Sequence, residues 1–145
     1  MCPVPRRYRP DRPLWNLYGP TEATCSCTVG DLQPGKPVDI GISLPSFSCF
    51  VVDPNTLVQL PDGQAGELVV TGISVGRGYL NRPEKTAEQF TILPAPHGGV
   101  RCYRTGDKAV VLDSATGAFT LLGRHSQAIG SAVILSGRRI HNHHN

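Results

Sequence analysis

The sequence predicts an α+β fold that is mainly antiparallel β, with one clear helix. Gly and Pro contribute 16 and 13 of the 145 residues, so turns are frequent and regular elements are short. Between residues 38 and 122, short runs rich in β-branched and aromatic residues alternate with turn sequences. Only the segment NRPEKTAEQF carries helix signals. A hydrophobic content of 39% with 17% charged residues is a globular balance.

Two strands are expected in the first half of this region. Phe47–Val52 is an apolar run that ends at the turn sequence Asp53-Pro54-Asn55. Pro61-Asp62-Gly63 is a second turn signal, and Glu67–Thr71 after it is rich in β-branched residues. Each turn lies next to a strand, so the pattern favours antiparallel neighbours.

The helix is expected to begin at Pro83, because the first helical position tolerates the missing N–H of proline. Glu84 suits the positive end of the helix dipole. Ala87 and Phe90 fall on one face at i, i+3 spacing.

The segment VRCYRTGDKAVVLDSATGAFTLLGR is expected to form three strands separated by two turns. The turns are Thr105-Gly106-Asp107 and Ser114–Gly117. Residues 113–117 then connect the runs AVVL and AFTLL as a hairpin.

Both ends of the chain have a different composition. Residues 1–13 contain four arginines interleaved with prolines, and we expect a disordered, extended leader. Residues 125–145 end in a His-rich tail, whose His141, His143 and His144 match no standard zinc spacing.

A net charge of +3 does not indicate nucleic acid binding, and no apolar run approaches the roughly 20 residues of a membrane span. Five cysteines without a CxxC pattern favour reduced thiols and a cytoplasmic location.

The stretch LWNLYGPTEATCSC, residues 14–27, carries the clearest chemical signal. A structural turn requires Gly19 and Pro20 but neither an aromatic ring before them nor a hydroxyl and a carboxylate after them. Tyr18 offers a ring to stack on a base, while Thr21 and Glu22 offer oxygens to a phosphate or its metal. This combination is suited to a nucleotide.

Three separated blocks carry a resemblance to a known family. NLYGPTEAT (16–24), GELVVTGISVGRGYLNRPEKTAEQF (66–90) and YRTGD (103–107) resemble successive motifs of the adenylate-forming, AMP-binding enzymes. They are most similar to the adenylation domains of nonribosomal peptide synthetases. The resemblance implies that residues 14–124 are the C-terminal part of the large subdomain, a truncated domain with a distorted barrel-like sheet. Residues 125–145 then correspond to a divergent hinge region and tail.

The resemblance also implies residue roles. Tyr18 would pack on adenine, Thr21 would contact a phosphate, and Glu22 would help to hold Mg²⁺. Asp107 and Arg124 would bind the ribose hydroxyls. The nucleotide-contacting positions are then Tyr18, Gly19, Thr21, Glu22, Asp107 and Arg124. Leu17, Cys25 and Ser26 would fall in the pocket for the acid substrate.

Family members activate an amino acid, or another carboxylic acid, with ATP to give an acyl-adenylate. A phosphopantetheine-bearing carrier domain then accepts the acyl group as a thioester. The family also uses a lysine in a phosphate-binding loop and another in a C-terminal subdomain. The chain has only Lys36, Lys85 and Lys108, none in such a context, so we expect it to be inactive alone. The alternative is a small, non-catalytic, β-rich interaction module or a gene remnant, with contacts made by residues 1–13 and 140–145.

Overall fold

The computed structural model describes residues 13–124, so the predicted leader and His-rich tail lie outside the described residues. Eight strands, one α-helix and one short 3₁₀ helix follow one another along this segment. In chain order they are β1 (Trp15–Tyr18), the 3₁₀ helix (Thr21–Ala23), β2 (Thr28–Asp31), β3 (Ile42–Ser43), β4 (Phe47–Val52), β5 (Gly66–Gly72), α1 (Pro83–Gln89), β6 (Phe90–Ile92), β7 (Arg101–Asp113) and β8 (Ala118–Arg124). The mainly antiparallel fold with one α-helix is confirmed for the described segment.

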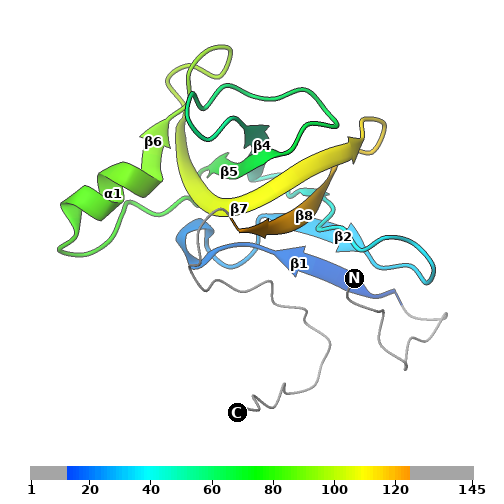
Figure 1. Cartoon of the computed structure of the whole chain (residues 1–145). Helices are drawn as coiled ribbons and strands as arrows, with labels where there is room; N and C mark the ends of the chain where they lie inside the picture. The colour runs from blue at the N-terminus through cyan, green and yellow to red at the C-terminus, as the bar shows by residue number, and fades with distance from the viewer. Residues whose placement is uncertain (1–12, 125–145) are drawn as a thin grey trace, which may run out of the picture.

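The strands form two sheets. β1, β2 and β3 pair in that order, and the larger sheet has the order β4-β5-β7-β6 with β8 also paired to β7. Every pairing is antiparallel. β7 is 13 residues long and curves strongly, which lets it pair with β5, β6 and β8 and gives the sheet its half-barrel shape (Figure 1). This confirms the barrel-like sheet that the resemblance implied.

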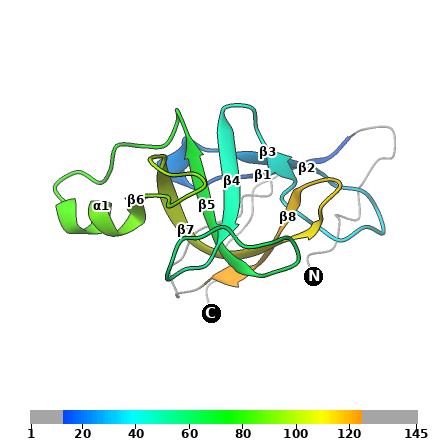
Figure 2. The same cartoon turned by 90° about the horizontal axis from the view of Figure 1, so that it is seen from above.

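The two sheets are joined at Gly41 and Phe119. The Phe119 N–H donates to the Gly41 carbonyl at 2.8 Å, and the Ile40 N–H donates to the Phe119 carbonyl at 2.9 Å. Viewed from above, β1, β2 and β3 lie close to β4 and β8 (Figure 2). Backbone hydrogen bonds therefore connect the sheet that carries the first sequence block to the sheet that carries the other two.

The main core lies between the two sheets. Its buried members include Tyr18, Cys27, Leu68 and Phe119. A second cluster, made of Val52, Val69, Leu93 and Cys102, packs on the other face of the larger sheet. β5 is consequently buried on both faces, so its residues form a continuous apolar run instead of alternating.

The predicted strands 47–52 and 67–71 are confirmed, and β5 extends one residue further at each end. The hairpin at 113–117 is also confirmed, since the Gly117 N–H donates to the Asp113 carbonyl at 2.9 Å. The turn expected at Thr105-Gly106-Asp107 is wrong, because β7 continues through it. These residues form an irregularity inside the strand, at which Gly106 adopts φ 73°.

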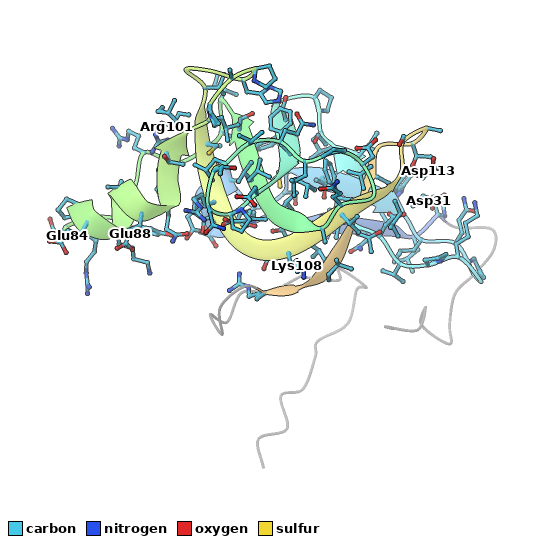
Figure 3. The ribbon with its side chains drawn as sticks, turned by 45° about the horizontal axis from the view of Figure 1, so that its top comes forward. Asp31, Glu84, Glu88, Arg101, Lys108 and Asp113 are labelled. Atoms are coloured by element: carbon cyan, nitrogen blue, oxygen red, sulfur yellow. The ribbon has the colours of Figure 1, made fainter. Side chains whose placement is uncertain are left out.

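Helix α1 begins at Pro83 as predicted and has Glu84 in its first turn. The expected apolar face is wrong, because Ala87 is exposed and Phe90 lies beyond the helix as the first residue of β6. Glu84 and Glu88 project outward from α1 (Figure 3). Phe90 is instead buried beside Tyr103 of β7, with ring centroids 5.0 Å apart.

The four cysteines in the described segment are free thiols, as expected for this part of the chain. No helix among residues 13–124 is long and apolar enough to cross a membrane.

Candidate functional site

The first sequence block folds into a tight loop that begins at the end of β1. The Cys27 N–H donates to the Tyr18 carbonyl at 2.8 Å, which closes the loop around the 3₁₀ helix. A Cβ at Gly19 would lie 2.5 Å from the Cys25 carbonyl oxygen and 2.6 Å from the Ser26 Cα. Only glycine therefore allows the chain to pass so close to itself. The loop fixes the positions of Tyr18 and of the 3₁₀ helix that carries Glu22.

The third block supplies the other side of the site. Tyr103, Thr105 and Asp107 alternate along β7 and are all buried. The Thr105 hydroxyl donates to the Leu68 carbonyl at 2.7 Å and accepts the Asp107 N–H at 3.0 Å. Neighbouring β5 therefore holds the backbone of the Asp107 region in place.

Tyr18, Asp107 and Arg124 converge on one carboxylate. The Tyr18 hydroxyl donates to Asp107 Oδ2 at 2.5 Å, and Arg124 Nε donates to Asp107 Oδ1 at 2.7 Å. Tyr18 and Asp107 are 89 residues apart in the sequence. Burial, and then the hydrogen bond to Asp107, raise the pKa of the Tyr18 hydroxyl, so it remains a proton donor. The structure thus brings together three of the predicted nucleotide residues.

Glu22 belongs to a second polar cluster. Its Oε1 accepts a hydrogen bond from the Tyr79 hydroxyl at 2.5 Å, and the Tyr79 and Tyr103 hydroxyl oxygens lie 3.5 Å apart. Burial raises the pKa of Glu22, but hydrogen bonds from Tyr79, the backbone and Tyr103, with the charge of Lys85, outweigh it and leave the pKa below its ordinary value. Glu22 is therefore an ionised carboxylate near neutral pH. Since Tyr103 and Asp107 share β7, that strand connects the two clusters.

The remaining predicted residues lie on the same loop. Thr21 and Cys25 are exposed, while Leu17 and Ser26 are half-buried. Thr24 and Cys25 both have positive φ, 56° and 75°, which reflects how sharply the chain returns towards β2. Among residues 13–124, no hydrogen bond or ion pair links Thr21 or the three pocket positions to Asp107, so their predicted roles stay predictions.

Tyr18, for which the resemblance implied a stacking role, is almost fully enclosed by the protein. Its side chain is only 4% exposed and belongs to the main core. A base can stack only on an accessible ring face. What the structure shows is a hydroxyl that holds Asp107, and the stacking role stays a prediction.

Residues 13–124 contain no group of three or more His, Cys, Asp or Glu side chains that could hold a metal ion. Mg²⁺ usually takes one or two protein carboxylates and completes its shell with water and substrate phosphates. The ionised, half-buried Glu22 fits the role of such a single ligand. The three histidines of the tail lie outside the described residues.

Two residues of the site had no predicted role. Tyr79 was part of the second block and Tyr103 opened the third, but neither was assigned a contact. Their partner Glu22 is 57 residues away from Tyr79 in the sequence. The only sequence signal for a role of Tyr79 and Tyr103 in the site was their position inside the second and third motif blocks.

Parts of this sequence are shared with known proteins. The family model described as "AMP-binding enzyme" matches residues 3–80, more than half of the chain. Nonribosomal peptide synthetase 2 of Gibberella zeae is 44% identical over 133 residues, 90% of this chain and 3% of that protein. A D-alanine--D-alanyl carrier protein ligase of Listeria monocytogenes is 40% identical over 111 residues, 72% of this chain and 21% of the ligase.

A solved structure is similar to this chain in fold. A four-domain nonribosomal peptide synthetase, crystallised with AMP and glycine, matches with a TM-score of 0.69 and 38% identity. The match covers 77% of this chain and 8% of that one. The chain therefore spans a small part of the length of the proteins that it matches.

Proposed function

Because the chain belongs to the AMP-binding enzyme family, we propose that its described segment supplies the adenosine-facing half of a nucleotide site. The observation that supports this proposal is the convergence of Tyr18 and Arg124 on the Asp107 carboxylate. Tyr18 lies 89 residues before Asp107 in the sequence, and Arg124 lies 17 residues after it. A purely structural core at this point needs no buried carboxylate.

Asp107 is suited to bind the two ribose hydroxyls of AMP. An ionised carboxylate has about four acceptor sites, and Tyr18 and Arg124 use one on each oxygen. Each oxygen therefore retains capacity for a further hydroxyl donor. The Arg124 guanidinium balances the charge of the Asp107 carboxylate, whose oxygens accept hydrogen bonds.

Thr21 and Glu22 would lie at the phosphate end. The exposed Thr21 hydroxyl can donate to a phosphate oxygen, and the Glu22 carboxylate would be one ligand of Mg²⁺. When bound, the metal neutralises charge on the phosphates during acyl-adenylate formation. Tyr79 would orient the Glu22 carboxylate through its hydroxyl.

For the whole protein we propose the adenylation reaction. A carboxylate oxygen of an amino or other carboxylic acid attacks the α-phosphorus of ATP, and the bond to pyrophosphate breaks. Leu17, Cys25 and Ser26 would contact the side chain of the acid. The thiol of a carrier domain would then attack the acyl carbon of the acyl-adenylate, the bond to the phosphate would break, and AMP would leave. The names of the relatives support this, since one is a carrier protein ligase and another was crystallised with AMP and glycine.

The binding proposal predicts that AMP perturbs the Asp107 region of this chain. In a titration followed by ¹H–¹⁵N NMR, we expect saturable shifts at Gly106, Asp107 and Arg124, with a dissociation constant on the order of 1 mM. Asp107→Asn should weaken binding at least tenfold, because it replaces one acceptor oxygen by a donor and removes the charge. Asp113→Asn, which changes an exposed carboxylate on the same strand, is the matched control and should bind as the wild type does.

Two outcomes would contradict the proposal. One is the absence of saturable shifts in a folded sample at about 10 mM AMP, ten times the expected dissociation constant. The other is shifts confined to the separate cavity of about 200 Å³ that Phe50, Leu60 and Phe119 line.

A further inference from the structure

Glu67 is a buried carboxylate with no predicted role in nucleotide binding. It lies on β5, is 4% exposed, and occupies the point at which the pairing of β5 with β7 shifts. Glu67 is opposite Lys108, whereas Val69 is opposite Arg104. The advance of two residues from Glu67 to Val69 on β5 thus lies opposite an advance of four residues, from Arg104 to Lys108, on β7. The additional residues belong to the segment Thr105-Gly106-Asp107, which we call the β7 bulge.

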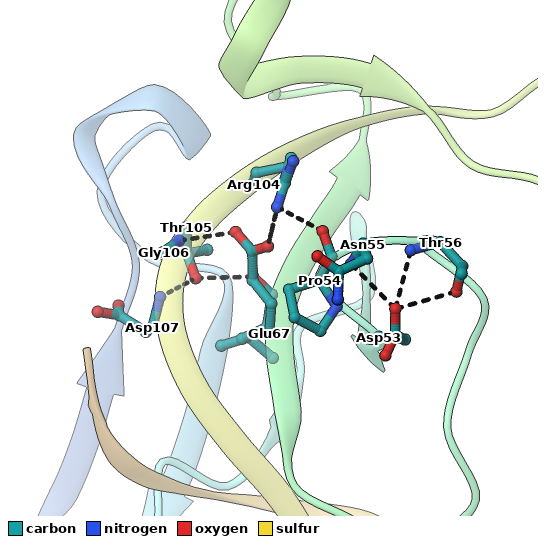
Figure 4. A network of polar contacts seen from close by, with 10 residues as sticks. Asp53, Pro54, Asn55, Thr56, Glu67, Arg104, Thr105, Gly106 and Asp107 are labelled. Atoms are coloured by element: carbon teal, nitrogen blue, oxygen red, sulfur yellow. Dashed lines mark hydrogen bonds and ion pairs between the residues drawn. The ribbon is translucent and has the colours of Figure 1, made fainter. Parts of the chain in front are cut away.

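Both oxygens of the Glu67 carboxylate hold this bulge. Oε1 accepts the Gly106 N–H at 3.1 Å. Oε2 accepts Arg104 Nη2 at 2.5 Å and Nε at 3.0 Å. Figure 4 shows the carboxylate between Arg104 and Gly106, while the Asp107 side chain points away on the other side of β7. Glu67 therefore contacts the bulge without contacting the Asp107 carboxylate.

The partner Arg104 also contacts the turn after β4. Its Nη2 also donates to the Pro54 carbonyl at 2.9 Å. The preceding Asp53 accepts the N–H groups of Asn55 and Thr56 at 2.9 and 2.8 Å, so this turn is internally braced (Figure 4). The Glu67–Arg104 pair thus connects the bulge to the turn after β4.

A role in stability alone does not account for this arrangement. Buried ion pairs are often no more stabilising than apolar residues of similar volume. Here the carboxylate also satisfies the N–H of Gly106, a residue with φ 73° inside a strand. An unpaired N–H at this half-buried point would favour another local conformation. The direction of Asp107 depends on that conformation.

We propose that Glu67 is a positioning residue for the nucleotide site. It fixes the β7 bulge from the opposite face of the sheet, so that Asp107 points towards Tyr18, Arg124 and the ribose. This inference rests on the proposed function, because it assigns Glu67 to the same site. Glu67 itself does not touch the nucleotide.

The test compares four proteins: the wild type, Glu67→Gln, Arg104→Lys and the control Leu93→Ala. Glu67→Gln removes the charge, and Arg104→Lys retains a charge but loses the two-pronged contact. Leu93 is buried in the second cluster and is not paired with Glu67 or with the β7 bulge, so we expect its truncation to lower stability alone. Folding is checked by circular dichroism. Affinities are then measured for AMP and for 2′,3′-dideoxy-AMP.

We expect Glu67→Gln and Arg104→Lys to weaken AMP binding on the order of tenfold, because a small misplacement of a binding group is costly. Both should also lose the preference for AMP over the dideoxy nucleotide. Leu93→Ala should melt at a lower temperature and keep the wild-type preference. Wild-type affinity and preference in both folded bulge variants would overturn the inference.

A nucleotide-independent measurement separates this inference from the proposed function. The Tyr18 hydroxyl proton, held by Asp107, should give a slowly exchanging resonance in the wild type and in Leu93→Ala. We expect that resonance to be lost in Glu67→Gln. If the wild type binds no AMP, the proposed function fails. Retention of the resonance in a folded Glu67→Gln chain overturns the positioning role of Glu67. The same comparison can be made with Arg104→Lys if Glu67→Gln does not fold.

Discussion

Replacing Gly41 with alanine is expected to destabilise the fold more than any other single substitution of a glycine in a loop. Gly41 has φ 71°, and a Cβ there would lie 1.8 Å from the Val29 carbonyl oxygen. Its own carbonyl accepts the Phe119 N–H that joins the two sheets. Left-handed strain costs about 1–3 kcal/mol, and relieving the clash costs about 1–3 kcal/mol more. The sum approaches the margin of about 5–15 kcal/mol for an ordinary domain.

Gly35→Ala is the matched control for this prediction. Gly35 also has positive φ, 78°, but a Cβ there would meet no atom within 4 Å. It should therefore cost only the backbone term, about 1 kcal/mol. Urea unfolding at 25 °C measures both variants. Equal losses of unfolding free energy would show that the packing of Gly41 against Val29 is looser than described.

Leu68→Ala is expected to have the second largest effect. Leu68 is fully buried at the centre of β5, within the core between the two sheets. Truncating a buried leucine removes apolar contacts and leaves a cavity, which costs about 2–5 kcal/mol. β5 pairs with both β4 and β7, so relaxation of one side is restrained by the other. We expect the cost to lie in the upper half of that range.

Leu80→Ala makes the same chemical change at a surface position. Leu80 is 89% exposed, and its truncation should change the unfolding free energy by less than about 0.5 kcal/mol. Denaturation midpoints of the two variants measure the difference. A Leu68→Ala variant as stable as Leu80→Ala would contradict a core centred on β5.

Local sequence signals predicted those elements whose pattern is complete within a short window. The run Phe47–Val52 and the hairpin at residues 113–117 needed only strand propensity and turn residues, and both are confirmed. The segment Thr105-Gly106-Asp107 has the same turn residues. However, β7 pairs with β5 and β8 on both sides of this segment. The pairing makes the segment a bulge within β7 instead of a turn. Such pairing is not visible in the local sequence.

The candidate site was predicted as far as the motifs reach. Asp107 and Arg124 were expected in one site, and they are in contact in the structure. The direction of the Tyr18 ring was not predictable, because it depends on core contacts with residues from both sheets. The contact of Tyr79 with Glu22 was missed for the same reason, since no local pattern pairs residues of two separate blocks.

The central claim is that the Asp107 carboxylate binds the ribose hydroxyls of an adenine nucleotide. The most direct test is calorimetric titration of the wild-type chain with AMP and, in parallel, with 2′,3′-dideoxy-AMP. The two nucleotides differ only in the ribose hydroxyls from which Asp107 would accept hydrogen bonds. Loss of two hydrogen bonds to a charged group is worth about 3 kcal/mol, so we predict at least 100-fold weaker binding of the dideoxy nucleotide. Equal affinities for the two nucleotides would contradict the account.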